Sequence, residues 1–324
     1  MPVMLGSAAH NAVLLSRKIR GDLSTMHVLL HHSAAVGASH CKGIDTGFMS
    51  LSPWKIAFLG VVQGITELLP ISSTAHLRAV PAFLGWPDPG SAFSAAMQLA
   101  ALAAVISYFW TDVSGTTVGA WRALRTRRWE EPEFRLTLVV IVATVPIVIA
   151  GASLSKILNS CHSPLRTPMV IGISSLVMAL LLALTERMAS HRRTGDHITF
   201  RDGILIGLAQ VGALIPGVSR SGATLTAALG LEFERAQAAR VSFLLGVPAI
   251  AAAGLHEIYE LAKYHLPMQG WYLLAIGLVI SSLASFVAIW GLMRFLERFS
   301  TWPFVYYRMA LGVLLIAGSI YGWF

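Results

Sequence analysis

The chain has 324 residues, of which 55% are hydrophobic and 12% are charged, and its formal net charge is +8. A soluble domain carries about 25% charged residues, so the composition excludes an ordinary soluble fold and favours helices that cross a membrane. The basic residues gather in short connectors, which is typical of loops beside anionic lipid headgroups rather than of a nucleic-acid surface. We therefore expect membrane lipids as partners and no nucleic acid.

The first 48 residues differ from the rest of the chain. They contain several histidines but little helical periodicity, and no apolar core follows their basic residues as it would in a signal peptide. We predict a poorly ordered N-terminal extension over residues 1–48 and a membrane domain over residues 49–324. Met49 is an alternative start of translation, because the sequence MSLSPWKIAFLG is typical of a membrane-protein N-terminus.

The next segment, GVVQGITELLPISSTAHLRAV over residues 60–80, combines an apolar background with polar groups and a central proline, Pro70. A broken segment cannot face lipid, because its free backbone groups would be unsatisfied in hydrocarbon. We predict a re-entrant helix–loop–helix that lines a polar cavity. Its polar side chains are Gln63, Glu67, Ser72, Ser73, Thr74 and His76.

Six apolar stretches are long enough, or extend far enough, to cross a bilayer. Three basic connectors between them, residues 111–135, 186–202 and 294–308, are expected on the cytoplasmic side, which leaves both termini outside. Arg308, near the start of the last stretch, is interpreted as a snorkelling anchor. The six stretches are Ser91–Trp110, Leu136–Leu154, Met169–Thr185, Val241–Leu255, Trp271–Leu292 and Ala310–Phe324.

A second polar segment, GLAQVGALIPGVSRSGATL over residues 207–225, repeats the first at an offset of about 147 residues. Gly60 and Gln63 match Gly207 and Gln210, although the two glutamines could also be interhelical hydrogen-bonding partners. Each polar segment precedes three apolar stretches, and three crossings give the two halves opposite topology. The predicted fold is an all-α integral membrane protein of two inverted repeats, with halves at about 49–190 and 198–324, whose re-entrant loops meet.

The residues at the two loop tips indicate an anion site. Serines and threonines after a proline cap helix N-termini, where free amides and the helix dipole favour phosphate. Arg220 adds a guanidinium that can bind two phosphate oxygens at once, and Gly217 allows the backbone to approach the anion closely. Glu67 beside a phosphate implies a divalent cation, Mg²⁺ or Ca²⁺, or a base, and His76 suits proton transfer or nucleophilic attack. Together these groups point to phosphoryl transfer.

The motifs QGITELLPISSTAHL and PGVSRSGAT resemble those of the undecaprenyl-diphosphate phosphatase family, the bacitracin-resistance type, and the resemblance covers about residues 49–324. It implies hydrolysis of undecaprenyl diphosphate with a divalent cation, at a site facing the outer side of the bacterial inner membrane. This reaction recycles the lipid carrier for cell-wall synthesis and confers bacitracin resistance. Gln63 stands where many members of the family have Glu. This removes one possible metal ligand or base and leaves that role to Glu67.

The resemblance also implies roles for individual residues. Glu67, His76 and Arg220 form the catalytic core, Glu67 is the metal ligand, and Ser73 is a nucleophile or a phosphate ligand. The attacking group stays open between serine, histidine and metal-bound water. The remaining residues expected to line the diphosphate site are Gln63, Ser72, Thr74, Gly217, Ser219, Ser221 and Thr224.

Two alternatives are kept beside this hypothesis. A polyprenyl-phosphate flippase would use the same anion site and the same inverted repeats. A lipid phosphatase of the vanadate-binding type would need a Lys and Arg-Pro motif that the sequence lacks. A homodimer is left open.

Overall fold

A computed structural model describes residues 45–128, 130–158, 164–194 and 198–323. Most of the predicted extension, residues 1–44, lies outside this part of the chain. The last residues of the predicted extension belong to the described structure. Gly47–Ser50 form a short 3-10 helix, and the Phe48 side chain is fully buried against Phe93. The packed unit begins at Thr46, a few residues before the predicted boundary at Met49.

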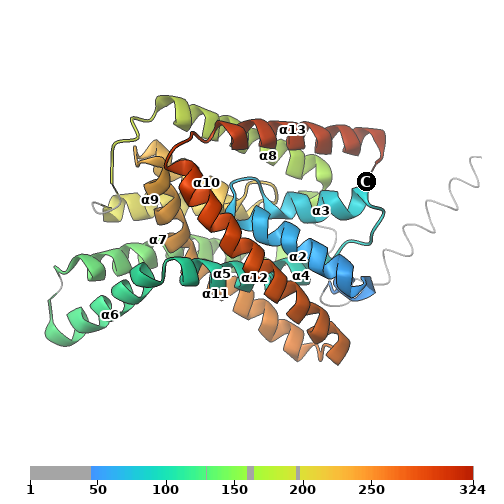
Figure 1. The fold of residues 1–324 in the computed structure, drawn as a ribbon, viewed down its shortest axis with the longest axis horizontal. Helices are drawn as coiled ribbons and strands as arrows, with labels where there is room; N and C mark the ends of the chain where they lie inside the picture. The colour runs from blue at the N-terminus through green and yellow to red at the C-terminus, as the bar shows by residue number, and fades with distance from the viewer. Residues whose placement is uncertain (1–44, 129, 159–163, 195–197, 324) are drawn as a thin grey trace, which may run out of the picture. The chain divides into compact units, whose positions relative to one another are not determined.

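The described residues fold almost entirely as helices, joined by short loops (Figure 1). One isolated bridge pairs Arg193 with Phe233. The helices are α2 (Pro53–Leu68), α3 (Ser73–Phe83), α4 (Gly90–Ala96), α5 (Gln98–Tyr108), α6 (Trp110–Thr126), α7 (Pro132–Leu158), α8 (Pro168–Met188), α9 (Phe200–Val211), α10 (Arg220–Gly230), α11 (Arg235–Lys263), α12 (Met268–Leu296) and α13 (Trp302–Tyr321).

Six helical stretches are long and apolar enough to cross a membrane, and each overlaps one of the six stretches expected from the sequence. The prediction of a multi-pass helical membrane protein is therefore confirmed. The stretches are Gly90–Tyr108, Pro132–Leu154, Pro168–Met188, Arg235–Lys263, Met268–Leu296 and Trp302–Tyr321.

Helix α6 forms most of the connector that the sequence analysis placed at residues 111–135. The segment is polar on one side, but Gly119, Ala120 and Ala123 give it a small-residue face that packs on α7. Gly119 lies so close to Glu133 that a side chain there would overlap it. The basic charge of the segment is carried by a helix and not by a loop.

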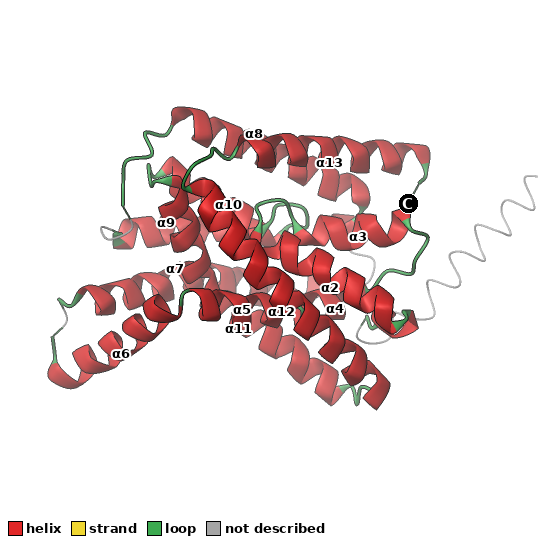
Figure 2. Ribbon diagram, viewed as in Figure 1, coloured by secondary structure: helices red, strands yellow, loops and turns green. Residues whose placement is uncertain are grey.

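Both polar segments are broken helices, as predicted. Helix α2 ends at Leu68 and α3 begins at Ser73, while α9 ends at Val211 and α10 begins at Arg220. Figure 2 shows the two connecting loops beside each other between the helices. Helix α2 packs along α12, α9 along α7, and α8 runs beside α13.

Close backbone contacts explain how α2 packs against α12 and how α9 packs against α7. Gly60 of α2 faces the backbone of Gly277 in α12, and Gly207 of α9 faces the backbone of Ala143 in α7. Small residues at helix contacts let backbones approach, which is how helices pack in membranes where water does not drive association. The two matched glycines therefore make equivalent contacts.

Candidate functional site

The two broken segments meet through side chains that the sequence analysis singled out. Arg220 of α10 donates a hydrogen bond to the Glu67 carboxylate of α2 at 3.3 Å. The Ser221 hydroxyl lies within 3.1 Å of the carbonyl oxygens of both Glu67 and Leu69. The predicted contact between the two loop tips is confirmed by these bonds, which link residues more than 150 positions apart.

Glu67 lies at the centre of this contact. Its side chain is 8% exposed, and the second carboxylate oxygen accepts hydrogen bonds from the Ser73 hydroxyl at 2.6 Å and from the Gln63 amide at 3.0 Å. Ser73 begins α3, while Gln63 lies one helical turn before Glu67 in α2. A buried carboxylate needs such partners, because desolvation without them is costly. The bond orients the Ser73 hydroxyl proton toward a base.

Ser72 and Ser219 occupy matching places at the starts of α3 and α10. Both have positive φ, 72° and 70°, an unusual conformation for a residue with a side chain. Each hydroxyl accepts a hydrogen bond from the amide three residues on, at Ala75 and Gly222. These caps satisfy one amide at each N-terminus, so each helix presents its other first-turn amides at the loop tip.

Arg308 is a residue that the sequence analysis misread. It does not snorkel: its side chain is completely buried. Its guanidinium donates hydrogen bonds to the carbonyl oxygens of Pro70 in the first loop and of Gly217 and Val218 in the second. A fourth bond goes to Ser175 of α8. The residue ties both loops to α8 and α13 and places a positive charge beside them.

His76 is held at both ring nitrogens. Nδ1 lies 2.7 Å from the Ser72 carbonyl oxygen, and Nε2 lies 2.6 Å from the hydroxyl of Tyr307 in α13. Tyr307 carried no motif signal, because a tyrosine in an apolar stretch reads as packing. Only its tertiary contact relates it to the site.

Gly246 of α11 is a second residue without a sequence signal. It lies against the Arg220 guanidinium so closely that an added Cβ would overlap it. The absence of a side chain at Gly246 is what leaves room for Arg220 to reach Glu67.

Three further predicted lining residues have contacts of their own. The Thr224 hydroxyl is buried and hydrogen-bonds to the Arg220 carbonyl and to Ser242 of α11, which directs it into the helix packing. Gly217 has φ +95° and packs on the α8 backbone, so it serves close packing and the Arg308 contact. Thr74 is partly exposed in the first turn of α3.

The described residues contain no group of three or more His, Cys, Asp or Glu that could hold a metal by themselves. The donors near Glu67 nevertheless fit a hard cation. Gln63 Oε1 is a buried oxygen with no hydrogen-bond partner in the described structure, one turn from the Glu67 carboxylate. Mg²⁺ is commonly bound by one or two protein oxygens together with substrate phosphates. Glu67 and Gln63 provide such a partial set.

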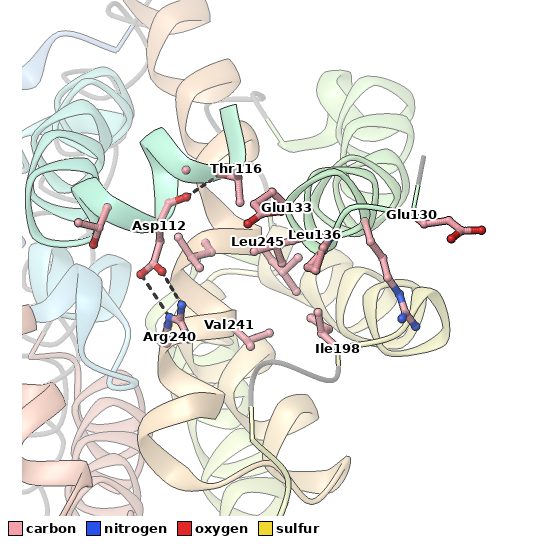
Figure 3. A pocket seen from close by; sticks show the side chains of 14 residues that line it. Asp112, Thr116, Glu130, Glu133, Leu136, Ile198, Arg240, Val241 and Leu245 are labelled. Carbon is pink, nitrogen blue, oxygen red and sulfur yellow. Dashed lines mark hydrogen bonds and ion pairs between the residues drawn. The ribbon is translucent and has the colours of Figure 1, made fainter. Parts of the chain in front are cut away.

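A cavity of about 540 Å³ lies elsewhere, between α6, α7 and α11 (Figure 3). Asp112 and Arg240 form an ion pair at its wall and join α6 to α11. None of the residues predicted for the diphosphate site lines it. The candidate site is therefore the contact of the two loops.

The fold and the loop contact define a multi-pass helical membrane protein in which the loops of two broken helices meet. A family profile described as bacitracin resistance protein BacA matches residues 56–314, and the chain belongs to this family. The chain is 64% identical over 262 residues to undecaprenyl-diphosphatase 2 of Mesorhizobium japonicum, covering 81% of this chain and 99% of that relative. It is 46% identical over 275 residues to the undecaprenyl-diphosphatase of a Synechocystis species, covering 85% of this chain and 84% of that relative.

Proposed function

We propose that this protein is an undecaprenyl-diphosphatase, which hydrolyses undecaprenyl diphosphate to undecaprenyl phosphate and inorganic phosphate. One observation carries the proposal: Arg220 and the Ser73 hydroxyl converge on the buried Glu67 carboxylate where the two loops meet. The names of the relatives support the same activity. They describe hydrolysis and not transport, so the flippase alternative is not retained. The product is the lipid carrier that cell-wall synthesis reuses, and removal of the diphosphate confers bacitracin resistance.

Arg220 is the proposed clamp for the terminal phosphate. Its guanidinium has five N–H donors, and the 3.3 Å bond to Glu67 leaves donors for phosphate oxygens. The first-turn amides of α3 and α10 add partial positive charge at the same place. Ser72, Ser219 and Ser221 shape the two loops that present these amides, and Thr74 adds a partly exposed hydroxyl in the first turn of α3.

Ser73 is the proposed nucleophile. Its oxygen attacks the terminal phosphorus, its proton passes to Glu67, and the bond from phosphorus to the bridging oxygen breaks to release undecaprenyl phosphate. Water then cleaves the phosphoserine, giving inorganic phosphate and restoring Ser73, which recovers the proton from Glu67. The 2.6 Å bond from Ser73 to Glu67 supports this order. His76 is less suited to direct attack, because both ring nitrogens are already hydrogen-bonded.

A divalent cation, Mg²⁺ or Ca²⁺, is proposed at Glu67 with Gln63 Oε1 as a second oxygen. When bound, it would neutralise phosphate charge that the carboxylate would otherwise repel. The unpartnered buried Gln63 oxygen supports this placement.

We also propose that the two halves of the chain form an inverted repeat, because corresponding helices of the two halves pack in the same way. Ser72 and Ser219 share backbone conformation and cap, while α2 against α12 corresponds to α9 against α7. Three apolar spans follow each broken helix, which supports opposite topology of the halves. We propose the bacterial inner membrane as the location, with the site open to the outer side. The homodimer stays a prediction that cross-linking in membranes can test.

Phosphate release from purified protein tests the proposal. Wild-type protein given undecaprenyl diphosphate should release phosphate, and a chelator should stop the release until Mg²⁺ or Ca²⁺ is restored. Glu67→Gln and Arg220→Ala should each lower turnover by roughly 10²-fold or more, because each removes a charge that stabilises the transition state. Both variants should keep the wild-type thermal unfolding midpoint to within a few degrees. Near-normal turnover in either folded variant would contradict the assigned site.

A further inference from the structure

The His76 ring is fixed by a backbone group on one side and by a side chain from a distant helix on the other. A carbonyl oxygen only accepts hydrogen bonds, so the 2.7 Å contact with Ser72 requires a proton on Nδ1. Neutral His76 therefore carries its lone pair on Nε2, which lies 2.6 Å from the Tyr307 hydroxyl. In this state the tyrosine donates and Nε2 accepts.

The same contact survives when His76 becomes charged. Both nitrogens of an imidazolium are donors, and a hydroxyl can accept as well as donate. Rotation of the Tyr307 hydroxyl proton reverses the hydrogen bond without moving a heavy atom. A carboxylate in that place would instead favour the charged ring, and an apolar side chain would leave Nε2 without this partner in both states.

The Tyr307 hydroxyl matters to His76 because the imidazole is buried. His76 is 7% exposed, so an Nε2 without a hydrogen bond would be costly, and more so for the charged ring. The rings of His76 and Tyr307 are nearly parallel, with centroids 5.5 Å apart. Arg308, the next residue of α13, is anchored to the carbonyls of both loops and so fixes where Tyr307 stands.

We propose that Tyr307 is a positioning residue for His76: its hydroxyl holds the Nε2 side of the buried imidazole and keeps that hydrogen bond in either protonation state of the ring. The proposal rests on the proposed phosphatase function, in which His76 belongs to the predicted catalytic core. It assigns to α13 a direct part in the site beside the structural part of Arg308.

Tyr307→Phe tests this with the ring kept and one oxygen removed. Loss of the hydrogen bond that positions this buried catalytic-core ring predicts a fall in kcat of about 10- to 100-fold. The KM for undecaprenyl diphosphate should stay within about twofold, because Tyr307 acts through His76 and not on bound phosphate. Tyr306→Phe removes the same atom from the preceding residue, whose ring stacks on Trp302, and should behave as wild type.

A second measurement does not depend on activity. In protein with ¹⁵N-labelled histidine, the Nε2 resonance of His76, assigned by its loss in His76→Gln, should move in Tyr307→Phe and not in Tyr306→Phe. An unmoved resonance, or an unchanged kcat in folded Tyr307→Phe, would overturn the role of Tyr307. Wild-type protein that releases no phosphate would instead overturn the proposed function, while the resonance would still report whether the hydrogen bond exists.

Discussion

Arg308 is a buried guanidinium whose hydrogen bonds go to backbone carbonyls of three different segments. In hydrocarbon surroundings a charged side chain is expensive, so such a residue persists where its donors are satisfied and its position serves the site. Here it replaces the missing partners of the carbonyl oxygens that the broken helices leave free. The cost of burying this charge is offset by its hydrogen bonds to carbonyl oxygens of both loops.

Arg308→Met should therefore destabilise the protein and weaken catalysis together. Several buried carbonyls would lose their donor, at about 1–3 kcal/mol for each group left unsatisfied. Thermal unfolding in detergent and phosphate release measure the two effects. Arg298→Met, at an exposed position near the end of α12, is the matched control and should leave both unchanged. An Arg308→Met protein as stable as wild type would show that these hydrogen bonds do not hold the two loops.

Gly246 bears on catalysis without touching phosphate. Gly246→Ala should displace the Arg220 guanidinium and lower kcat/KM by about 10²-fold, since a shift of about 1 Å at a catalytic group can have that effect. Gly291→Ala in α12, where the added Cβ meets nothing within 4 Å, should retain full activity. Equal kinetics in the two variants would show that Arg220 has room to adjust.

At the scale of elements, the start of α9 is fastened by a local network. Thr199 and Asp202 form a capping box, and Arg193 from the preceding connector donates to both Asp202 oxygens. Burial opposes ionisation of the Asp202 carboxyl, but the hydrogen bonds from Arg193 and Thr199 outweigh it and lower its pKa. The network sets where the second broken helix begins.

This lowered pKa predicts a pH dependence of stability. A carboxyl with a depressed folded-state pKa stabilises the fold above its unfolded pKa, about 3.9, and the contribution is lost as pH falls through the folded value. Asp202→Asn should lower the free energy of unfolding by about 1 kcal/mol near neutral pH. The difference from wild type should shrink below about pH 4, as measured by denaturation at a series of pH values. A difference that stays constant down to pH 2 would contradict the ionic contribution.

At the scale of the whole molecule, the packed unit extends to Thr46 because Phe48 is buried on Phe93 and its amide bonds to the Pro89 carbonyl. A chain that starts at Thr46 should retain phosphate release and thermal stability. A chain that starts at Met49 should be less stable by about 3–5 kcal/mol, the usual cost of deleting a buried Phe side chain. Phe48→Ala in the full chain is the control that separates the side chain from the missing backbone.

The sequence by itself determined the membrane class, the six spans, the two broken helices and the residues of the two motifs. Bilayer thickness imposes span length, and a proline between polar residues cannot sit in a lipid-facing helix, so both signals are local. It also indicated that Glu67 and Arg220 belong to one site, through the internal repeat.

Only the tertiary structure decided the roles of Arg308, Tyr307 and Gly246. Each acts through a contact with a residue far away in the chain, and an arginine, a tyrosine or a glycine in an apolar stretch has the same local pattern whether it faces lipid or the site. The inward direction of Thr224 and the helix at residues 110–126 likewise depended on which neighbours pack against them. Hydropathy specifies which segments enter the membrane, whereas helix packing specifies which of their faces meet.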